Sequence, residues 1–224
     1  AVISQQPTAA KTTGLRLSVP QDNAGVVGVP ALNRGSNAPA GPTLPLEWIN
    51  SQAALAHMVE LLASQPHIAL DVETAPDFGA LCLIQIATAQ KVYLIDPFVV
   101  EDLTPLAAIF GVAVPAKIIH NAKFERKILA GVGLELTGVI DTIELSRQRR
   151  GPDVLGGHAL DLVCERELGI AIDKSMQTSD WTTRPLSPEQ IAYAAMDVEV
   201  LLKLHAHFGT AAAADLKRDG QAPS

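Results

Sequence analysis

Apolar residues recur along the first part of the chain with the spacing of a helix and then of short strands. From Leu46 to Pro66 they fall three and four positions apart, which predicts one helix. Three short apolar runs follow at 67–72, 81–87 and 91–95, and each has the length of a strand. The connection between the last two is short enough for a hairpin, so we expect three consecutive antiparallel strands.

Beyond these strands the pattern alternates between helices and strands. The predicted elements are a helix at 103–110, a strand at 117–119, a helix at 122–130, a strand at 139–141 and helices to the C-terminus. The last helix is expected to start after Pro188 and to run towards Phe208. Strands in series followed by alternating helices and strands predict an α/β domain with a mixed sheet flanked by helices.

Composition separates this domain from the two ends of the chain. Residues 1–45 hold six of the 15 prolines and no aromatic residue, so they cannot bury enough apolar surface to offset the entropy of ordering. We expect a flexible tail or linker there, a folded domain at 46–210 and a short polar tail at 211–224. Because the chain begins at Ala1 rather than Met, we also expect a processed chain or a part of a longer one.

Charge and apolar content limit the class of partner. The net charge is -7, and after residue 45 there are 14 basic and 23 acidic residues, a net of -9. Such a domain would hold nucleic acid through a few local cations, stacking side chains and bound metal, and not through a broad positive field. No apolar run approaches the roughly 18 residues of a membrane-spanning helix, so no membrane partner is expected.

Two cysteines, Cys82 and Cys164, lie within apolar segments. We expect both to be buried free thiols, with a disulfide or a metal site as the alternative. Free thiols indicate the cytoplasm or another reducing intracellular compartment.

Acidic residues stand in pairs that local structure brings together. Asp71 and Glu73 end the first of the three strands, and the strand period of two places both side chains on one face. Taken alone, this pair also fits a solvated strand end. Tyr193 and Asp197 lie four positions apart and share a helical face, a spacing that is also common in purely structural helices.

Asn121 and Glu125 form a third pair at the start of a predicted helix, again on one face. The alternative is that Asn121 caps the helix and Glu125 is a favourable acid in its first turn. Clustered carboxylates repel one another unless cations neutralise them, and hard oxygen ligands select Mg²⁺ or Mn²⁺. Two such ions about 4 Å apart can activate a water and stabilise the leaving 3′ oxygen of a phosphodiester.

Longer stretches of the sequence are similar to a known family. They are Leu70–Thr74, Leu83–Ile86, His120–Phe124, Asp141–Thr142 and, most specifically, Leu160–Leu202 with Asp173–Lys174, Gln177–Trp181, Arg184–Leu186 and Tyr193–Val198. In these motifs residues 48–208 resemble the DEDD 3′–5′ exonucleases with the ribonuclease H-like fold, and within them the tyrosine-containing, ribonuclease D-like branch. The resemblance implies an enzyme that hydrolyses phosphodiester bonds at single-stranded 3′ ends of DNA or RNA and releases nucleoside 5′-monophosphates.

The resemblance also implies roles for individual residues. Two divalent cations, Mg²⁺ or Mn²⁺, would be bound by the acids, with Asp71 bridging both ions and Glu73 and Asp197 completing the tighter site. Glu125 would serve the second ion, and Tyr193 would orient or deprotonate the attacking water. The residues that the resemblance places against the substrate are Thr74, Gln85, Asn121, Lys123 and Phe124.

Glu125 is the one departure from the family pattern, which carries Asp at this position. Its longer side chain predicts a weaker second site and hence a preference for Mn²⁺ over Mg²⁺. The main alternative is therefore a catalytically weakened domain that binds nucleic acid or a protein partner. A third interpretation is the proofreading part of a longer polymerase-like or helicase-like chain.

Further residues have more than one interpretation. Asp141 fits an N-cap or a support near the metals. Six cations fit either phosphate contacts or a solvated surface: Lys123, Arg126, Lys127, Arg147, Arg149 and Arg150. Three large side chains fit stacking against bases, and the last of them also fits a core position: Phe78, Met176 and Trp181.

Overall fold

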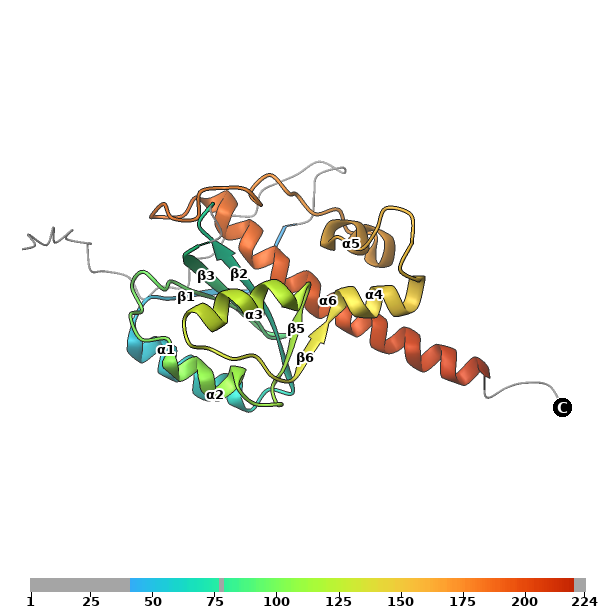
Figure 1. Cartoon of the computed structure of the whole chain (residues 1–224), viewed down its shortest axis with the longest axis horizontal. Coiled ribbons are helices and arrows are strands. Elements are labelled where there is room, and N and C mark those ends of the chain that lie inside the picture. Colours follow the sequence, from blue (N-terminus) through green and yellow to red (C-terminus); the bar gives the residue numbers. More distant parts are fainter. Residues whose placement is uncertain (1–40, 77–78, 220–224) are drawn as a thin grey trace, which may run out of the picture.

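The computed structural model describes residues 41–76 and 79–219, which form a six-stranded sheet with helices on both faces (Figure 1). The strands are β1 (Leu46–Ile49), β2 (His67–Thr74), β3 (Leu81–Ala87), β4 (Val92–Ile95), β5 (Ala116–Ile119) and β6 (Val139–Asp141). The helices are α1 (Gln52–Ala63), the short 3₁₀ helix η1 (Thr104–Leu106), α2 (Ala107–Phe110), α3 (Ala122–Gly131), α4 (Thr142–Arg150), α5 (Leu160–Leu168) and α6 (Pro188–Asp219). The tail expected at 1–45 lies outside the described residues except for its last five, and Phe78 also lies outside them.

β2 lies inside the sheet, whose order is β1-β4-β3-β2-β5-β6. β2, β3 and β4 pair antiparallel, as the sequence predicted. The other pairs are parallel: β1 with β4, β2 with β5, and β5 with β6. This mixed sheet confirms the predicted fold class. β2 lies between β5, which pairs with its first three residues, and β3, which pairs with the rest of it up to Thr74.

The segment from Leu46 to Ile49 is a strand, so the prediction of one helix beginning at Leu46 was wrong in its first part. β4 offers this segment a free edge, and Leu46 pairs with Val92 in parallel register. The helix begins only after Ser51, whose side chain accepts a hydrogen bond from the backbone of Ala54. The apolar pattern of these four residues fits both a helix and a strand, and the pairing with β4 decides in favour of the strand.

α6 is longer than predicted. It begins at Pro188 but continues beyond Phe208 through an alanine-rich stretch, and alanine has the highest helix propensity. Residues 211–219, which were expected in the polar tail, are therefore helical. Within the described ranges, no helix combines the length and the apolar character needed to cross a membrane.

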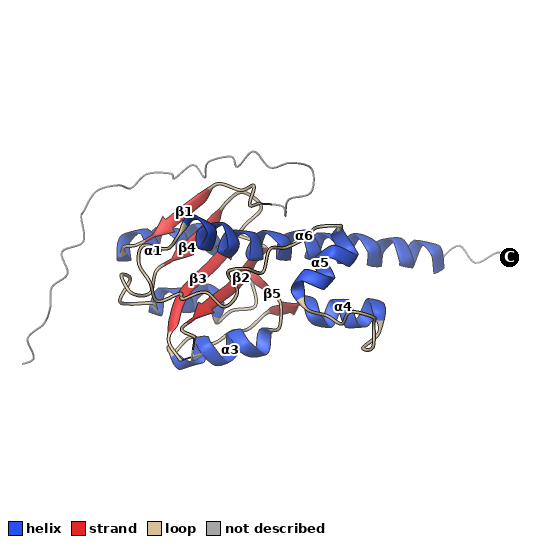
Figure 2. Ribbon diagram, turned by 90° about the horizontal axis from the view of Figure 1, so that it is seen from above, coloured by secondary structure: helices blue, strands red, loops and turns tan. Residues whose placement is uncertain are grey.

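The core has two halves, one on each face of the sheet (Figure 2). α1, α2 and α3 cover one face with side chains such as Leu55 and Leu129. α6 covers the other face together with Trp181, which packs in the same cluster as Leu83 of β3. α5 joins the distal part of α6 through a third cluster that contains Cys164. Both cysteines are free and buried, as expected.

Asp141, at the end of β6, holds the starts of two helices. Its carboxylate accepts a hydrogen bond of 3.0 Å from the backbone N–H of Ile143 and so caps α4, as predicted. It also accepts hydrogen bonds of 3.0 and 2.9 Å from the backbone of Asn121 and Ala122 at the start of α3. Asn121 occupies the N-cap position with a positive φ of 70°, but its side chain makes no capping bond. The capping role expected for Asn121 is thus carried out by Asp141.

Replacing Asp141 by Ala should lower the free energy of unfolding by about 2 kcal/mol. The reason is that the backbone N–H groups of Asn121, Ala122 and Ile143 lose the carboxylate that accepts their hydrogen bonds. Chemical denaturation measures this loss. Asp102→Ala is the matched control, since the Asp102 carboxylate accepts hydrogen bonds only locally, from the N–H and hydroxyl of Thr104 in an exposed turn. The control should lose clearly less stability than Asp141→Ala. Equal losses in the two variants would contradict the double role of Asp141.

Candidate metal centre and active site

Three carboxylates from two elements meet at the end of β2. Asp71 and Glu73 lie two positions apart near the C-terminal end of this strand, and Asp197 lies on α6, which covers the same face. One carboxylate oxygen from each lies within 4.8 Å of the others. The strand period explains why the two acids of β2 share a face. Only the packing of α6 on the sheet adds the third.

Glu125 lies beside this group of three but not within it. Its side chain is 3% exposed on the first turn of α3 and hydrogen bonds with that of Asp71. Its Oε2 atom is buried and receives no amide, hydroxyl or ammonium donor from the described residues. A buried acid without donors is costly to ionise unless a cation is bound. Glu125 therefore extends the acidic group on the side of Asp71.

Tyr193 lies one helical turn before Asp197 on α6, and the two side chains hydrogen bond. Burial, and then the charges of Asp197 and Glu73, raise the pKa of the Tyr193 phenol above its ordinary range. The hydroxyl therefore stays protonated and donates to Asp197. The tyrosine ring lies 6.0 Å from that of Trp181, measured between centroids.

Burial raises the pKa of all four carboxyl groups and is the largest cause in each. The pKa rises to about 6 for Asp71, to about 9 for Glu125 and to about 10 for Glu73. The pKa of Asp197 is also raised well above its ordinary value. In Glu73, Glu125 and Asp197, repulsion from Asp71 adds to the effect of burial. Without a cation, the site therefore holds protons at neutral pH.

The chemistry of these donors fits divalent cations. Carboxylate oxygens are hard ligands of the kind that Mg²⁺ and Mn²⁺ prefer. Asp71, Glu73 and Asp197 present three such oxygens close enough to share one ion. A bound cation would displace the protons that burial retains on these groups. The acidic cluster therefore has the ligands of a metal centre.

The carboxylates line a cavity of about 440 Å³. Its wall is formed by the end of β2, the starts of α3, α4 and α5, residues from the segment 172–181, and α6. Six separate parts of the chain therefore enclose the acids. A cavity of this size belongs to the range of small-ligand sites, which is ~300 to 1,000 Å³.

Three of the five residues expected to contact the substrate line this cavity, namely Thr74, Asn121 and Phe124. The described lining residues do not include Gln85 or Lys123. Gln85 is 0% exposed in β3, and neither polar atom of its amide has a hydrogen-bond partner within the described residues. Lys123 is exposed on α3. Position within a motif does not determine the direction in which a side chain points.

Three further lining residues were not singled out from the sequence, namely His120, Asp161 and Lys174. The Lys174 ammonium lies 2.9 Å from the Asp161 carboxylate, and Lys174 is the one lysine or arginine among the described lining residues. The imidazole of His120 is held between the Thr142 hydroxyl and the carbonyl of His158. Burial lowers the pKa of His120 to about 4, so this ring is neutral. A signal was available for all three residues, because each lies within one of the family motifs.

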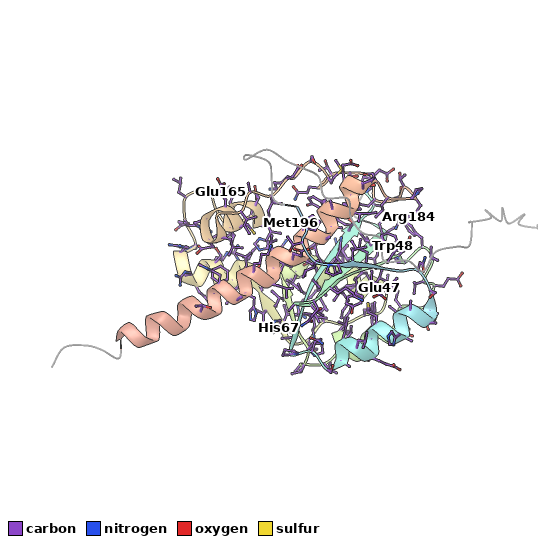
Figure 3. The ribbon with its side chains drawn as sticks, turned by 180° about the vertical axis from the view of Figure 1, so that it is seen from behind. Glu47, Trp48, His67, Glu165, Arg184 and Met196 are labelled. Carbon is purple, nitrogen blue, oxygen red and sulfur yellow. The ribbon has the colours of Figure 1, made fainter. Side chains whose placement is uncertain are left out.

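Arg184 fixes the segment 172–187 to the sheet. Its guanidinium forms a bidentate ion pair with the buried Asp96, just after β4, at 2.7 and 3.0 Å. It also donates to the backbone carbonyls of Cys82 in β3 and of Trp181. Arg184 lies beside the N-terminal end of α6 (Figure 3). Trp181, so held, is 1% exposed and packs in the core, which favours the structural interpretation of this residue over stacking on a base.

Comparisons with known proteins point to one family. A family model described as a 3′–5′ exonuclease matches residues 46–211. The chain is 32% identical over 163 residues to DNA polymerase I of Aquifex aeolicus, covering 72% of this chain and 27% of that protein. It is also 32% identical over 163 residues to ribonuclease D of Escherichia coli, covering 71% of this chain and 43% of that protein. The crystal structure of the Aedes aegypti Nibbler EXO domain is similar with a TM-score of 0.65 and 26% identity, covering 74% of this chain and 87% of that one.

The chain thus spans less than half the length of these two curated relatives. The matched residues run from β1 into α6 and include every carboxylate of the cavity. Because the family model covers most of the chain and the very elements that build the acidic site, this protein belongs to the 3′–5′ exonuclease domain family, with ribonuclease D-like relatives.

Proposed function

We propose that this protein is a metal-dependent 3′–5′ exonuclease, which removes nucleotides from single-stranded 3′ ends and releases nucleoside 5′-monophosphates. The observation that carries the proposal is the meeting of Asp71, Glu73 and Asp197 in a cavity of about 440 Å³. Such a volume suits a terminal nucleotide. Membership of a 3′–5′ exonuclease family supports the same activity.

The cofactors in this proposal are two divalent cations, Mg²⁺ or Mn²⁺. Asp71, Glu73 and Asp197 would hold one ion, and Glu125, which is bonded to Asp71, would help to hold the second. Bound ions of this kind lower the pKa of water and stabilise the charge on a leaving oxygen. The position of Glu125 outside the group of three supports a weaker second site, and a weaker site favours Mn²⁺.

Tyr193 and Lys174 complete the proposed machinery. The Tyr193 hydroxyl stays protonated, so it would orient the attacking water by hydrogen bonding and would not remove its proton. Lys174 could exchange Asp161 for a phosphate oxygen of the substrate, because both the carboxylate and the phosphate bind an ammonium group strongly. Thr74 and Phe124, which line the cavity, would position the terminal nucleotide.

The proposed substrate is a single strand of either DNA or RNA. Relatives of the chain bear the names of a DNA polymerase and of a ribonuclease, and discrimination between sugars would depend on contacts to the 2′-hydroxyl. Because these relatives are longer, we propose that a protein partner or another part of a longer chain helps to hold the strand. The two buried free thiols support a reducing intracellular compartment such as the cytoplasm.

A 5′-labelled single strand of DNA or RNA, incubated with the protein and Mg²⁺ or Mn²⁺, should shorten from its 3′ end one nucleotide at a time. EDTA should abolish the reaction, and Asp71→Asn should slow it by at least about 100-fold, as the loss of one charge-stabilising group does in other enzymes. Gel time courses measure both effects. Asp153→Asn, which removes an exposed acid outside the cavity wall, is the control. No cleavage by a folded protein that binds the strands would favour a catalytically weakened binding domain.

Glu125→Asp should raise the ratio of the rate with Mg²⁺ to the rate with Mn²⁺ by roughly tenfold, because changes around a metal commonly alter affinity by 10- to 100-fold. Initial rates over a titration of each metal measure this ratio. Glu60→Asp, the same substitution at an exposed position of α1, should leave it unchanged. If Glu125→Asp also leaves the ratio unchanged, the longer side chain does not weaken the second site.

Without metal the protein should lose stability as the pH rises from about 4.5 to about 10. The folded pKa values of Asp71, Glu125 and Glu73 are raised, so retained protons favour the folded state until the pH passes about 6, 9 and 10 respectively. Excess Mg²⁺ or Mn²⁺ should therefore raise the Tm most at alkaline pH. Thermal melts across this pH range, with EDTA and with metal, measure how the Tm depends on pH and on metal. Asp71→Asn should reduce both dependences. A Tm that responds to neither pH nor metal would refute the metal site.

A further inference from the structure

Basic side chains from three helices surround one buried carboxylate at the far end of α4. The side chain of Glu167 on α5 is 0% exposed. Arg150 donates to both of its oxygens, at 2.7 and 3.1 Å, while Arg166 and His207 approach to 3.3 Å. The hydrogen bonds from Arg150 lower the pKa of Glu167, so this acid remains ionised. One bidentate arginine is already a strong partner for a carboxylate.

Arginines of α4 on this surface also reach solvent. Arg147 pairs with Glu144, and Arg149, Arg150 and Arg166 lie within 3.7 Å of Glu167. The side chains of Arg147 and Arg150 are 48% and 41% exposed. By contrast, the chain after residue 45 has 14 basic and 23 acidic residues. Two arginine side chains of α4 thus reach solvent on an otherwise acidic protein.

The cavity and these arginines share one face of α4. Ile143 lines the cavity, and Arg147 and Arg150 follow it at i+4 and i+7, positions that lie on the same helical face. At a rise of about 1.5 Å per residue, Arg150 lies about 10 Å along the helix from Ile143. α4 leads away from the sheet next to α5 and α6 (Figure 1). A strand leaving the cavity past Ile143 can therefore follow α4 to the arginines.

We propose that Arg147 and Arg150 bind the sugar-phosphate backbone of a single strand of nucleic acid whose 3′ end lies in the cavity. The inference rests on the proposed exonuclease function and adds the path of the rest of the strand. Guanidinium groups match phosphate geometry and stay charged at every physiological pH. Arg147 would exchange the exposed Glu144, 2.6 Å away, for a phosphate. At ~3.4 Å per stacked nucleotide, the arginines meet the strand about three nucleotides from the cavity.

The test measures binding separately from cleavage. All binding measurements use the chain carrying Asp71→Asn, with Mg²⁺ present. Fluorescence anisotropy gives the Kd of a 5′-fluorescein-labelled strand of about 12 nucleotides, either DNA or RNA. The Kd is measured at salt concentrations between about 50 and 200 mM. An unlabelled dinucleotide serves as a competitor that is too short to reach α4. The variants are Arg147→Gln, Arg147→Gln with Arg150→Gln, and Glu144→Gln. Lys91→Gln is the control, because Lys91 is an exposed cation beside β4, towards the opposite edge of the sheet.

The slope of log Kd against log salt should fall by about 0.7 in Arg147→Gln and by about 1.4 in the double variant. Glu144→Gln should tighten binding of the long strand, an opposite effect that damage to the fold would not produce. Lys91→Gln should behave as the parent, and dinucleotide competition should be the same in all variants. Unchanged long-strand binding in folded Arg147→Gln overturns the inference and leaves the arginines to an acidic protein partner.

The same proteins distinguish this inference from the proposed function. For this comparison Asp71 is restored in the parent chain. If the parent chain then cleaves strands, but the arginine variants bind strands as tightly as the parent, only the path along α4 is refuted. A parent chain that binds long strands through the arginines but does not cleave them refutes the exonuclease and leaves the path intact.

Discussion

Repulsion among buried carboxylates is the constraint on which the rest of this protein depends. Asp71, Glu73 and Asp197 lie within 4.8 Å of one another, and Glu125 is bonded to the first of them. Burial disfavours every one of these charges, and their mutual repulsion adds to the cost. A fold selected for stability alone would separate such groups or pair them with arginine. Keeping them together makes sense when a divalent cation supplies the missing positive charge.

The surrounding structure holds these acids in place against that repulsion. β2 pairs with β5 through its first three residues and with β3 along most of its length, and Asp71 and Glu73 project from the part that pairs with β3. Asp141 ties the starts of α3 and α4 together, and Arg184 fastens the wall segment of the cavity to β3 and β4. Each anchor is a charged group with several hydrogen bonds, a kind of contact that fixes geometry more strictly than apolar packing does. The four carboxylates are therefore held together by the fold itself.

In the proposed mode of binding, nucleic acid contacts two places of opposite charge. The cavity is acidic, and its one described lysine or arginine, Lys174, is paired with Asp161. Phosphates would therefore be repelled from the cavity unless cations occupied it. The exposed arginines lie instead at the far end of α4, on the face that leads to the cavity. An acidic protein can thus hold a polyanion by combining a metal centre with a small basic surface, without a positive net charge.

The sequence by itself determined the features that depend on local periodicity. The strand at 81–87 and the strand at 139–141 have the predicted bounds. The second strand follows Gly138 and ends at Asp141, which is the N-cap of the next helix. The shared face of Asp71 and Glu73, and that of Tyr193 and Asp197, follow from the periods of a strand and of a helix. Sequence motifs added the family and hence the expected chemistry.

Only the tertiary structure decided how these local pieces meet. It turned the first four residues of the expected helix into β1, because β4 had a free edge for them to pair with. In the tertiary structure Asp141 also accepts hydrogen bonds from the start of α3, Gln85 is buried in the sheet, and Lys174 lines the cavity. Contacts between segments far apart in the chain depend on which surfaces pack together, and the period of a single segment carries no information about its partner.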